Sequence, residues 1–166
     1  ISGIDFVAPR PPEDGPGIPY RRETGGGIVL ADLDGDGQED LLLTAVGGPN
    51  ELYQGLGEGQ FQALQGTGLE DGSFTFGATA ADLNGDGLKE VLLADSTELR
   101  LFENLGGLNF MERSPLVSLS ADGFPVGASI VDFNGDGLVD IYVPVRLDWS
   151  AGAEPVLLGD LLLLGQ

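Results

Sequence analysis

The sequence contains no cysteine and no histidine, and each absence removes a class of chemistry. Without cysteine the chain has no disulfide framework and no thiolate metal site. Without histidine it has no Ser-His-Asp or Cys-His nucleophile, no histidine-bound zinc and no imidazole for proton transfer. We therefore expect no catalytic residues of these kinds.

Basic residues are also scarce, with 7 Lys and Arg against 27 Asp and Glu, so the net charge is −20. Such a surface repels nucleic-acid phosphates and anionic lipid headgroups, so we expect no nucleic-acid partner. We also expect no membrane insertion, because the apolar stretch 156–164 is interrupted by Gly159 and Asp160 and is too short to span a bilayer. The chain begins at Ile1 rather than Met, which predicts a processed product or an excised segment.

Glycine, by contrast, is abundant: the 166 residues include 28 Gly and 10 Pro. Gly and Pro at this density separate many short elements, which favours an all-β protein over a helical one. The hydrophobic content of 42% is sufficient for a real core, and the length fits one domain.

An acidic pattern, Asp-x-Asp/Asn-Gly-Asp-Gly-x-x-Asp/Glu, occurs three times, starting at Asp32, Asp82 and Asp132. The period is 50 residues both times. Each copy lies between two short apolar runs that are typical of buried strands. The runs before the loops are 27–31, 77–81 and 127–131, and those after them are 41–46, 91–94 and 141–145. Small residues enrich the runs before the loops, which suits inner strands whose backbones lie close together.

Two further strands complete the repeat. The third strands are predicted at 50–54 and 98–102, and the fourth at 59–64 and 108–113. A run around Phe6 corresponds to these fourth strands, with a longer connection after it. Four short strands in roughly 50 residues are typical of a β-propeller blade. A sandwich of short strands is the alternative, but it does not explain the regularly repeated acidic loop.

We therefore predict an all-β fold of β-propeller blades, each with four antiparallel strands, in three repeats. Residues 1–25 would form the outer strand of an adjacent blade and a connection, followed by blades at 26–75, 76–125 and 126–166, the last without its outer strand. Three blades cannot close a ring, and open sheet edges invite pairing. The chain is then either part of a longer propeller or associates with copies of itself, each copy lending its Phe6 strand to a neighbour.

The acidic loops offer oxygen atoms at alternate positions, as Ca²⁺ requires with its six to eight oxygen ligands. Positions 1, 3, 5 and 9 supply side chains and position 7 supplies a backbone carbonyl, which predicts three Ca²⁺ sites. The predicted ligands are Asp32, Asp34, Asp36, Gln38 and Asp40; Asp82, Asn84, Asp86, Leu88 and Glu90; and Asp132, Asn134, Asp136, Leu138 and Asp140. Mg²⁺ fits less well, because it demands stricter octahedral geometry.

Two other interpretations of the loops are weaker. Asp/Asn-Gly runs also form plain hairpin turns, but a turn needs only two such residues, and crowded carboxylates repel one another without a cation. A helical calcium sensor would need flanking amphipathic helices and a Glu at position 12, where Leu43, Leu93 and Val143 stand instead.

These motifs resemble the FG-GAP/VCBS repeat family, the calcium-binding blades of integrin-α-type propellers. Phe76-Gly77 matches the family's Phe-Gly, and 47–49 stands where the family has Gly-Ala-Pro; the third copy departs at 126–127 and 144–145. Segments 31–37 and 50–53 look most like bacterial and cartilage-acidic-protein-like members. The resemblance implies a first strand lining the axis, Ca²⁺ in the loop after it, and an extracellular or periplasmic location.

The resemblance also implies protein or glycan binding, adhesion or scaffolding rather than catalysis. The alternative is the propeller part of a carbohydrate-active or phosphodiester-cleaving enzyme, with a carboxylate pair as acid and base. Candidates for this role outside the loops are the carboxylates of Glu70, Asp71, Asp95, Glu103 and Asp122. Their spacing in the sequence does not single out any pair. Candidate contact sites are 146–149, with the single Trp149, and the basic cluster 20–22, since insertions often carry recognition.

Overall fold

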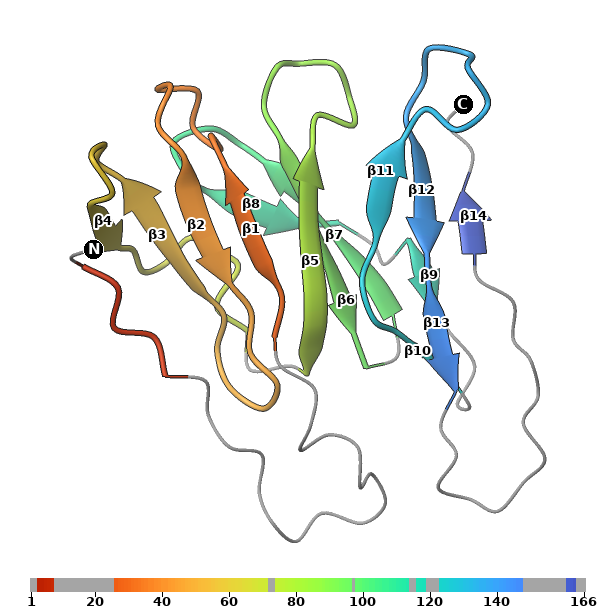
Figure 1. The fold of residues 1–166 in the computed structure, drawn as a ribbon, viewed down its shortest axis with the longest axis horizontal. Coiled ribbons are helices and arrows are strands. Elements are labelled where there is room, and N and C mark those ends of the chain that lie inside the picture. Colours follow the sequence, from red (N-terminus) through yellow and green to blue (C-terminus); the bar gives the residue numbers. More distant parts are fainter. Residues whose placement is uncertain are drawn as a thin grey trace, which may run out of the picture.

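A computed structural model of the chain describes residues 3–7, 26–71, 74–96, 98–113, 116–118, 123–147 and 161–163. Every element of regular secondary structure among these residues is a β-strand. Three antiparallel sheets extend from a row of inner strands, β1, β5 and β11, as Figure 1 shows. Within the described residues no helix has the length and apolar character needed to cross a membrane.

The first sheet has the order β1-β2-β3-β4, with every neighbouring pair antiparallel. Its strands are Ile28–Ala31, Asp40–Leu43, Glu51–Gly55 and Phe61–Ala63. Each lies within a run that the sequence predicts as a strand, apart from end residues such as Asp40 and Gly55. The four-stranded blade is therefore confirmed for the first repeat.

The second sheet repeats this order as β5-β6-β7-β8. Its strands are Thr75–Ala81, Glu90–Asp95, Glu98–Asn104 and Phe110–Glu112. A further strand that the sequence did not predict, β9 (Val117–Ser118), pairs with the beginning of β7 while β8 pairs with its end. The outer position of this sheet is thus shared by two short strands.

The third sheet has the order β11-β12-β14, with strands Ser129–Val131, Asp140–Val143 and Leu161–Leu163. Its third strand lies at 161–163, after a long connection of which residues 148–160 are outside the described residues. The structure also contains an unpredicted two-stranded ribbon, β10 (Gly123–Pro125) with β13 (Val145–Leu147). Pro144 separates β12 from β13, because proline has no N–H to donate to a continuous ladder.

The predicted strand around Phe6 is not formed in the single chain. Residues 4–7 have no strand assignment and lie beside the outer edge of the first sheet. Gly3 is so close to this edge that a Cβ there would lie 1.7 Å from the carbonyl oxygen of Phe61. A strand exists only where a partner strand pairs with it, and residues 4–7 pair with none of the described strands.

The core consists of two layers of side chains between successive sheets. Val29, Leu42 and Leu52 of the first sheet pack with Leu93 and Phe102 of the second, and each is at most 7% exposed. A second layer joins the second sheet to the third through residues such as Leu92, Leu99 and Ile141. Burial of each such side chain contributes about 1.5–3 kcal/mol, so face-to-face packing of the sheets holds the array together.

The inner strands approach one another at glycine. A Cβ on Gly27 would lie 2.7 Å from the Cα of Gly77, and one on Gly77 would lie 2.8 Å from the carbonyl oxygen of Val126. Gly127, at the same place in the third repeat, has no neighbour within 4 Å. The expectation that small residues allow the inner strands to pack closely is confirmed.

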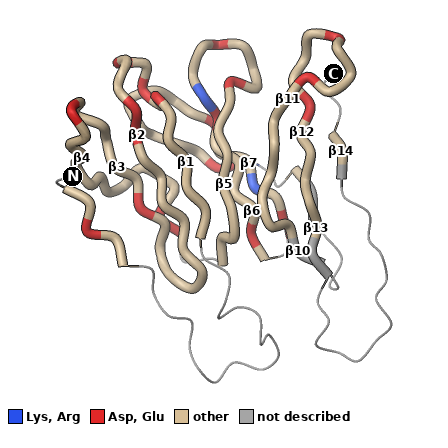
Figure 2. The backbone as a smooth tube through the Cα atoms, in the orientation of Figure 1, with Lys and Arg blue, Asp and Glu red and all other residues tan. Residues whose placement is uncertain are grey.

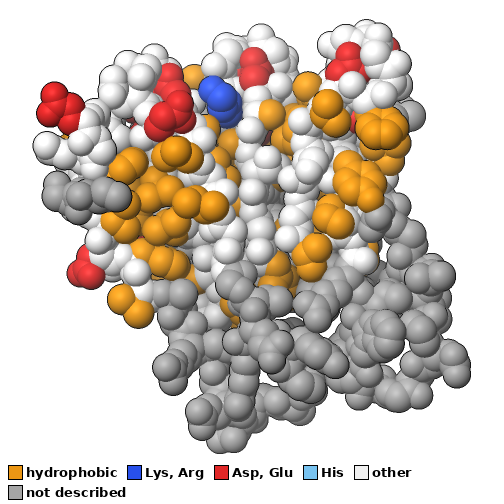
Figure 3. All heavy atoms as spheres, in the orientation of Figure 1, with side chains coloured by type: hydrophobic (Ala, Val, Ile, Leu, Met, Phe, Trp, Pro, Cys, Tyr) orange, Lys and Arg blue, Asp and Glu red, His pale blue; other side chains and the backbone are white. Residues whose placement is uncertain are grey.

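The faces of the first and third sheets that point away from the second sheet expose hydrophobic side chains (Figure 3). On the first sheet, Ile28 and Leu30 are 65% and 59% exposed. On the third sheet, Tyr142 and Leu162 are 37% and 42% exposed, whereas Leu42 at the same repeat position as Tyr142 is 0% exposed. These faces therefore carry the residue types of a sheet-to-sheet interface, although none of the described sheets covers them.

Candidate metal centre

The three acidic loops lie along one edge of the array. They connect β1 to β2, β5 to β6 and β11 to β12, and Asp and Glu residues gather on them (Figure 2). Because each loop follows an inner strand and the inner strands are neighbours, the 50-residue period of the sequence becomes a row of equivalent loops in space.

The first Asp of each loop holds the loop closed. Asp32 accepts hydrogen bonds from the N–H groups of Gly35 at 2.8 Å and Gly37 at 3.0 Å. Both glycines have φ near +80°, a conformation that residues with a Cβ rarely adopt. Asp82 and Asp132 accept the corresponding pairs of bonds in their own loops.

The last acidic residue of each loop is buried at the start of the second strand. Asp40 and Asp140 are 0% exposed, and Glu90 is 3% exposed. Asp40 accepts N–H groups from Leu33 at 2.9 Å and Gly55 at 2.9 Å. Burial raises the pKa of Asp40, the two backbone hydrogen bonds lower it, and the charges of nearby carboxylates raise it, with a net increase. A buried carboxylate in this setting is stabilised by a cation.

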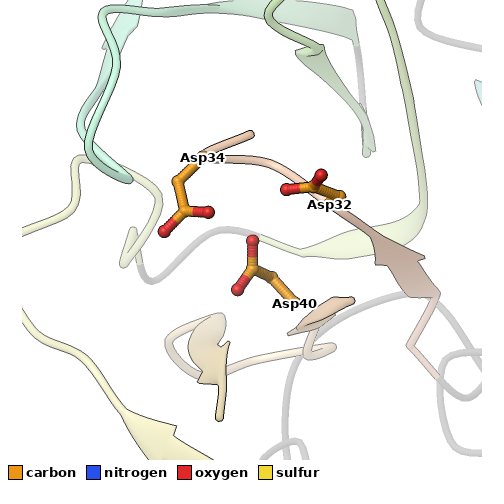
Figure 4. A group of neighbouring side chains, drawn as sticks. All are labelled: Asp32, Asp34 and Asp40. Carbon is orange, nitrogen blue, oxygen red and sulfur yellow. The ribbon is translucent and has the colours of Figure 1, made fainter. Parts of the chain in front are cut away.

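Three carboxylates converge in the first loop. Asp32, Asp34 and Asp40 each place one oxygen within 4.8 Å of the others (Figure 4). Asp36 is not in this group, and its Oδ1 accepts the N–H of Gln38 at 2.7 Å. The amide of Gln54 donates to Asp34 Oδ2 at 3.1 Å, so a residue from β3 orients one of the converging groups.

The second and third loops carry Asn at position 3, so each has one carboxylate fewer. The Asn84 amide donates to Asp86 at 3.0 Å and to Glu90 at 3.3 Å. The Asn134 amide donates to Asp136 at 3.0 Å. In both loops the N–H of position 7, Leu88 or Leu138, donates to the position 5 carboxylate, as in the first loop.

Basic residues are few among the described residues, and their contacts are specific. The ion pairs found there gather around Arg100 and Arg113. Lys89 reaches the first loop, but its Nζ donates to the backbone carbonyl of Asp32 at 3.1 Å. The available donors are carboxylate, amide and carbonyl oxygens, which suit a hard cation such as Ca²⁺ or Mg²⁺.

A family description, "FG-GAP-like repeat", matches the chain twice, over residues 32–93 and 82–143. The chain belongs to the FG-GAP-like repeat family. Each FG-GAP-like match begins at the first Asp of an acidic loop and ends in the strand that follows the next loop. The family and the strand topology together show a β-propeller-like module of a non-catalytic kind. No curated protein matches the chain.

The carboxylates considered for catalysis have structural partners where the structure describes them. Glu70 accepts N–H groups from Thr67 and Gly68. Asp71 and Asp95 pair with Arg100, and Glu103 pairs with Arg113. Asp122 lies outside the described residues, as do the contact candidates 20–22 and 148–149.

A hollow of about 500 Å³ lies between the N-terminal segment and the outer half of the first sheet. Its lining includes Asp5, Glu51 and Tyr53. The Tyr53 hydroxyl donates to Glu51 at 2.5 Å, and burial together with this bond raises the pKa of Tyr53 to about 12. Tyr53 therefore stays protonated at neutral pH and donates to the Glu51 carboxylate rather than transferring protons.

Proposed function

We propose that each acidic loop binds one Ca²⁺ and that the chain is a calcium-stabilised module for protein or glycan binding or scaffolding. The convergence of Asp32, Asp34 and Asp40 carries this proposal. A bound Ca²⁺ would supply the positive charge that relieves carboxylate repulsion. The side chains at positions 1, 3, 5 and 9 and the carbonyl at position 7 would hold it in every loop.

The choice of Ca²⁺ over Mg²⁺ rests on the donor set. Each loop offers five residues with oxygen donors on a short, glycine-containing segment, and carboxylates can bind through one or both oxygens. Ca²⁺ accepts such variable geometry, whereas Mg²⁺ retains several waters and binds through one or two carboxylates. An extracellular or periplasmic location is proposed with it, because FG-GAP-like repeats are typically extracellular and extracellular modules bind Ca²⁺ at about 10⁻⁴–10⁻³ M.

Thermal unfolding tests the calcium assignment. Ca²⁺ at 100 times the dissociation constant stabilises the fold by about 2.7 kcal/mol per site. For a chain of this length each kcal/mol raises Tm by about 2–4 °C. We expect a chelator to lower Tm by at least several degrees, Ca²⁺ to restore it, and Mg²⁺ at the same concentration to restore less.

The matched control is the triple variant Asp32→Asn, Asp82→Asn and Asp132→Asn, which keeps one of the two oxygen acceptors that the loop glycines use. Its Tm should be insensitive to both chelator and Ca²⁺. A wild-type Tm that is the same in chelator and in excess Ca²⁺ would contradict the proposal.

The binding role, rather than catalysis, is supported by the structural partners of the described carboxylates outside the loops. Incubation with a panel of polysaccharides and phosphodiesters should leave these compounds intact. Hydrolysis by the purified chain, lost in a single-carboxylate variant, would instead favour the enzymatic alternative.

We further propose that a second copy of the chain covers the exposed faces of the first and third sheets. The support is positional: Tyr142 and Leu162 correspond to Leu42 and Leu52, which are fully buried between the first two sheets. Sedimentation in Ca²⁺ should give a mass above that of one chain, and Tyr142→Ser with Leu162→Ser should reduce it to one chain. A monomeric wild type would contradict this proposal without affecting the calcium assignment.

A further inference from the structure

The buried amide of Asn104 joins the first acidic loop to the second. Asn104 ends β7 and is 2% exposed. Its Nδ2 donates to the carbonyl of Leu33 at 2.8 Å and to the carbonyl of Lys89 at 3.0 Å. Its Oδ1 accepts the N–H of Gly106 at 3.0 Å, which fixes the direction of the amide. Both amide hydrogens are therefore used, one for each loop.

The two carbonyls lie next to proposed calcium ligands. Leu33 stands between Asp32 and Asp34, and its N–H donates to Asp40 Oδ2. Lys89 stands between Leu88 and Glu90 of the second loop. Any displacement of ligand residues in one loop thus moves a carbonyl that Asn104 binds.

Lys89 makes a second connection in the opposite direction. Its backbone belongs to the second loop, while its Nζ donates to the carbonyl of Asp32, the first residue of the first loop. The Leu33 side chain, 1% exposed, also packs in the same cluster as Leu108 and Phe110 of the second repeat. The contact between the two loops therefore combines hydrogen bonds with buried apolar surface.

The Lys89 link has no counterpart between the second and third loops. Position 8 of the loop is Glu39, Lys89 and Val139 in turn, and valine has no side-chain donor. The second and third loops form an internal control for the first and second.

We propose that Asn104 and Lys89 are positioning residues that couple calcium binding in the first loop to calcium binding in the second. This inference rests on the calcium sites proposed above. An ion that orders the first loop fixes the carbonyls of Asp32 and Leu33, which hold Lys89 and Asn104. The second loop then loses less conformational freedom when it binds its own ion, so the coupling is positive and reciprocal.

Calorimetric titration with Ca²⁺ tests the coupling in the full chain. Asp→Asn at position 1 disables chosen loops, giving proteins with loop 1 only, loop 2 only, and loops 1 and 2 together. The coupling factor is the overall two-ion constant divided by the product of the single-loop constants. We expect about fivefold for loops 1 and 2, at the lower end of the usual range. For loops 2 and 3, measured with Asp32→Asn, it should be smaller, because Val139 supplies no counterpart to the Lys89 link.

Two variants assign the coupling to the proposed residues. Lys89→Met keeps the aliphatic stem and removes the donor, and Asn104→Leu removes both amide donors; each should bring the factor for loops 1 and 2 toward unity. A purely structural role would lower both single-loop affinities and leave the factor unchanged. If Asn104→Leu does not fold, Lys89→Met decides the matter on its own.

The outcomes separate the two proposals. Binding at all loops with independent affinities would overturn the coupling and leave the calcium sites standing. Equal coupling for loops 2 and 3, or coupling that survives both variants, would overturn the assignment to Asn104 and Lys89. A lack of calcium binding in every protein would overturn the proposed sites and the coupling with them.

Discussion

Replacement of Gly77 by alanine tests whether contact between the inner strands determines the geometry of the array. Gly77 lies in β5, and a Cβ at this position would be 2.8 Å from the Val126 carbonyl oxygen and 2.9 Å from the Gly127 Cα. Both neighbours are backbone atoms of the third repeat, so no side-chain rotation relieves the contact. The inner strands β5 and β11 must separate locally to accept the methyl group.

The magnitude follows from two opposing effects. Forcing an extra carbon into a packed interface costs about 1–3 kcal/mol. Replacing glycine by alanine also restricts the unfolded chain, which offsets about 0.4–1 kcal/mol where the native conformation accepts alanine. We therefore expect Gly77→Ala to lower the free energy of unfolding by about 1–2 kcal/mol. This corresponds to a Tm lower by about 2–8 °C.

Gly127→Ala is the matched control, because no atom lies within 4 Å of a Cβ at that position. It should leave stability unchanged or raise it slightly. Urea unfolding followed by circular dichroism in saturating Ca²⁺ measures both variants. Equal effects of the two substitutions would refute the argument, since they differ in the inner-strand contact and share the change in unfolded-state entropy.

Two further predictions concern buried charge. Arg100 pairs with Asp71, Asp95 and Glu112, and its side chain is 11% exposed. Arg100→Met should therefore lower the free energy of unfolding by about 3–5 kcal/mol. The side chain of Arg113 is 48% exposed, so Arg113→Met should lower it by less than about 1 kcal/mol. Urea unfolding compares them, and similar losses would contradict the reasoning. For Glu70, burial acts to raise the pKa, but hydrogen bonds from Thr67, its own N–H and Gly68 outweigh this and lower it below 4.5. Its stabilisation is therefore present above pH 4.5 and is lost as pH falls through the lower folded value. Glu70→Gln should destabilise the protein by about 1 kcal/mol at pH 7, and the difference from wild type should shrink on acidification; a constant difference would count against it.

The strands next to the acidic loops could be predicted because their signal is local. Ile28–Ala31 and Asp40–Leu43 are short apolar runs bounded by glycine or an acidic loop, and burial between sheets demands such runs. The crowding of the inner strands also followed from composition alone, since Gly27 and Gly77 stand where backbones meet. The hydrogen bonds that Asp32 accepts in its loop are also local, because the donors are only three and five residues away.

Elements that depend on distant partners could not be predicted in this way. The β10–β13 ribbon pairs Gly123–Pro125 with Val145–Leu147, and each segment contains or adjoins a proline that weakens its strand signal. The β14 strand follows a long segment and pairs with β12, so its position depends on tertiary contacts. The strand around Phe6 stays a prediction, because it was expected to pair with an adjacent blade, and residues 4–7 pair with none of the strands that the structure describes.

Contacts between neighbouring loops depend on residues that differ from one repeat to the next. The strand registers align Tyr53 with Phe102, so Gly55 corresponds to Asn104, and the amides of Gln54 and Asn104 are not at equivalent positions. Gln54 binds a carboxylate of its own loop, whereas Asn104 binds carbonyls of two loops. The positions shared by the repeats specify the blade itself. Residues that differ between repeats, such as Lys89 and its counterpart Val139, specify which blades are neighbours. Exchange of the second and third repeats would preserve every loop motif and lose the Lys89 link, because Val139 has no side-chain donor.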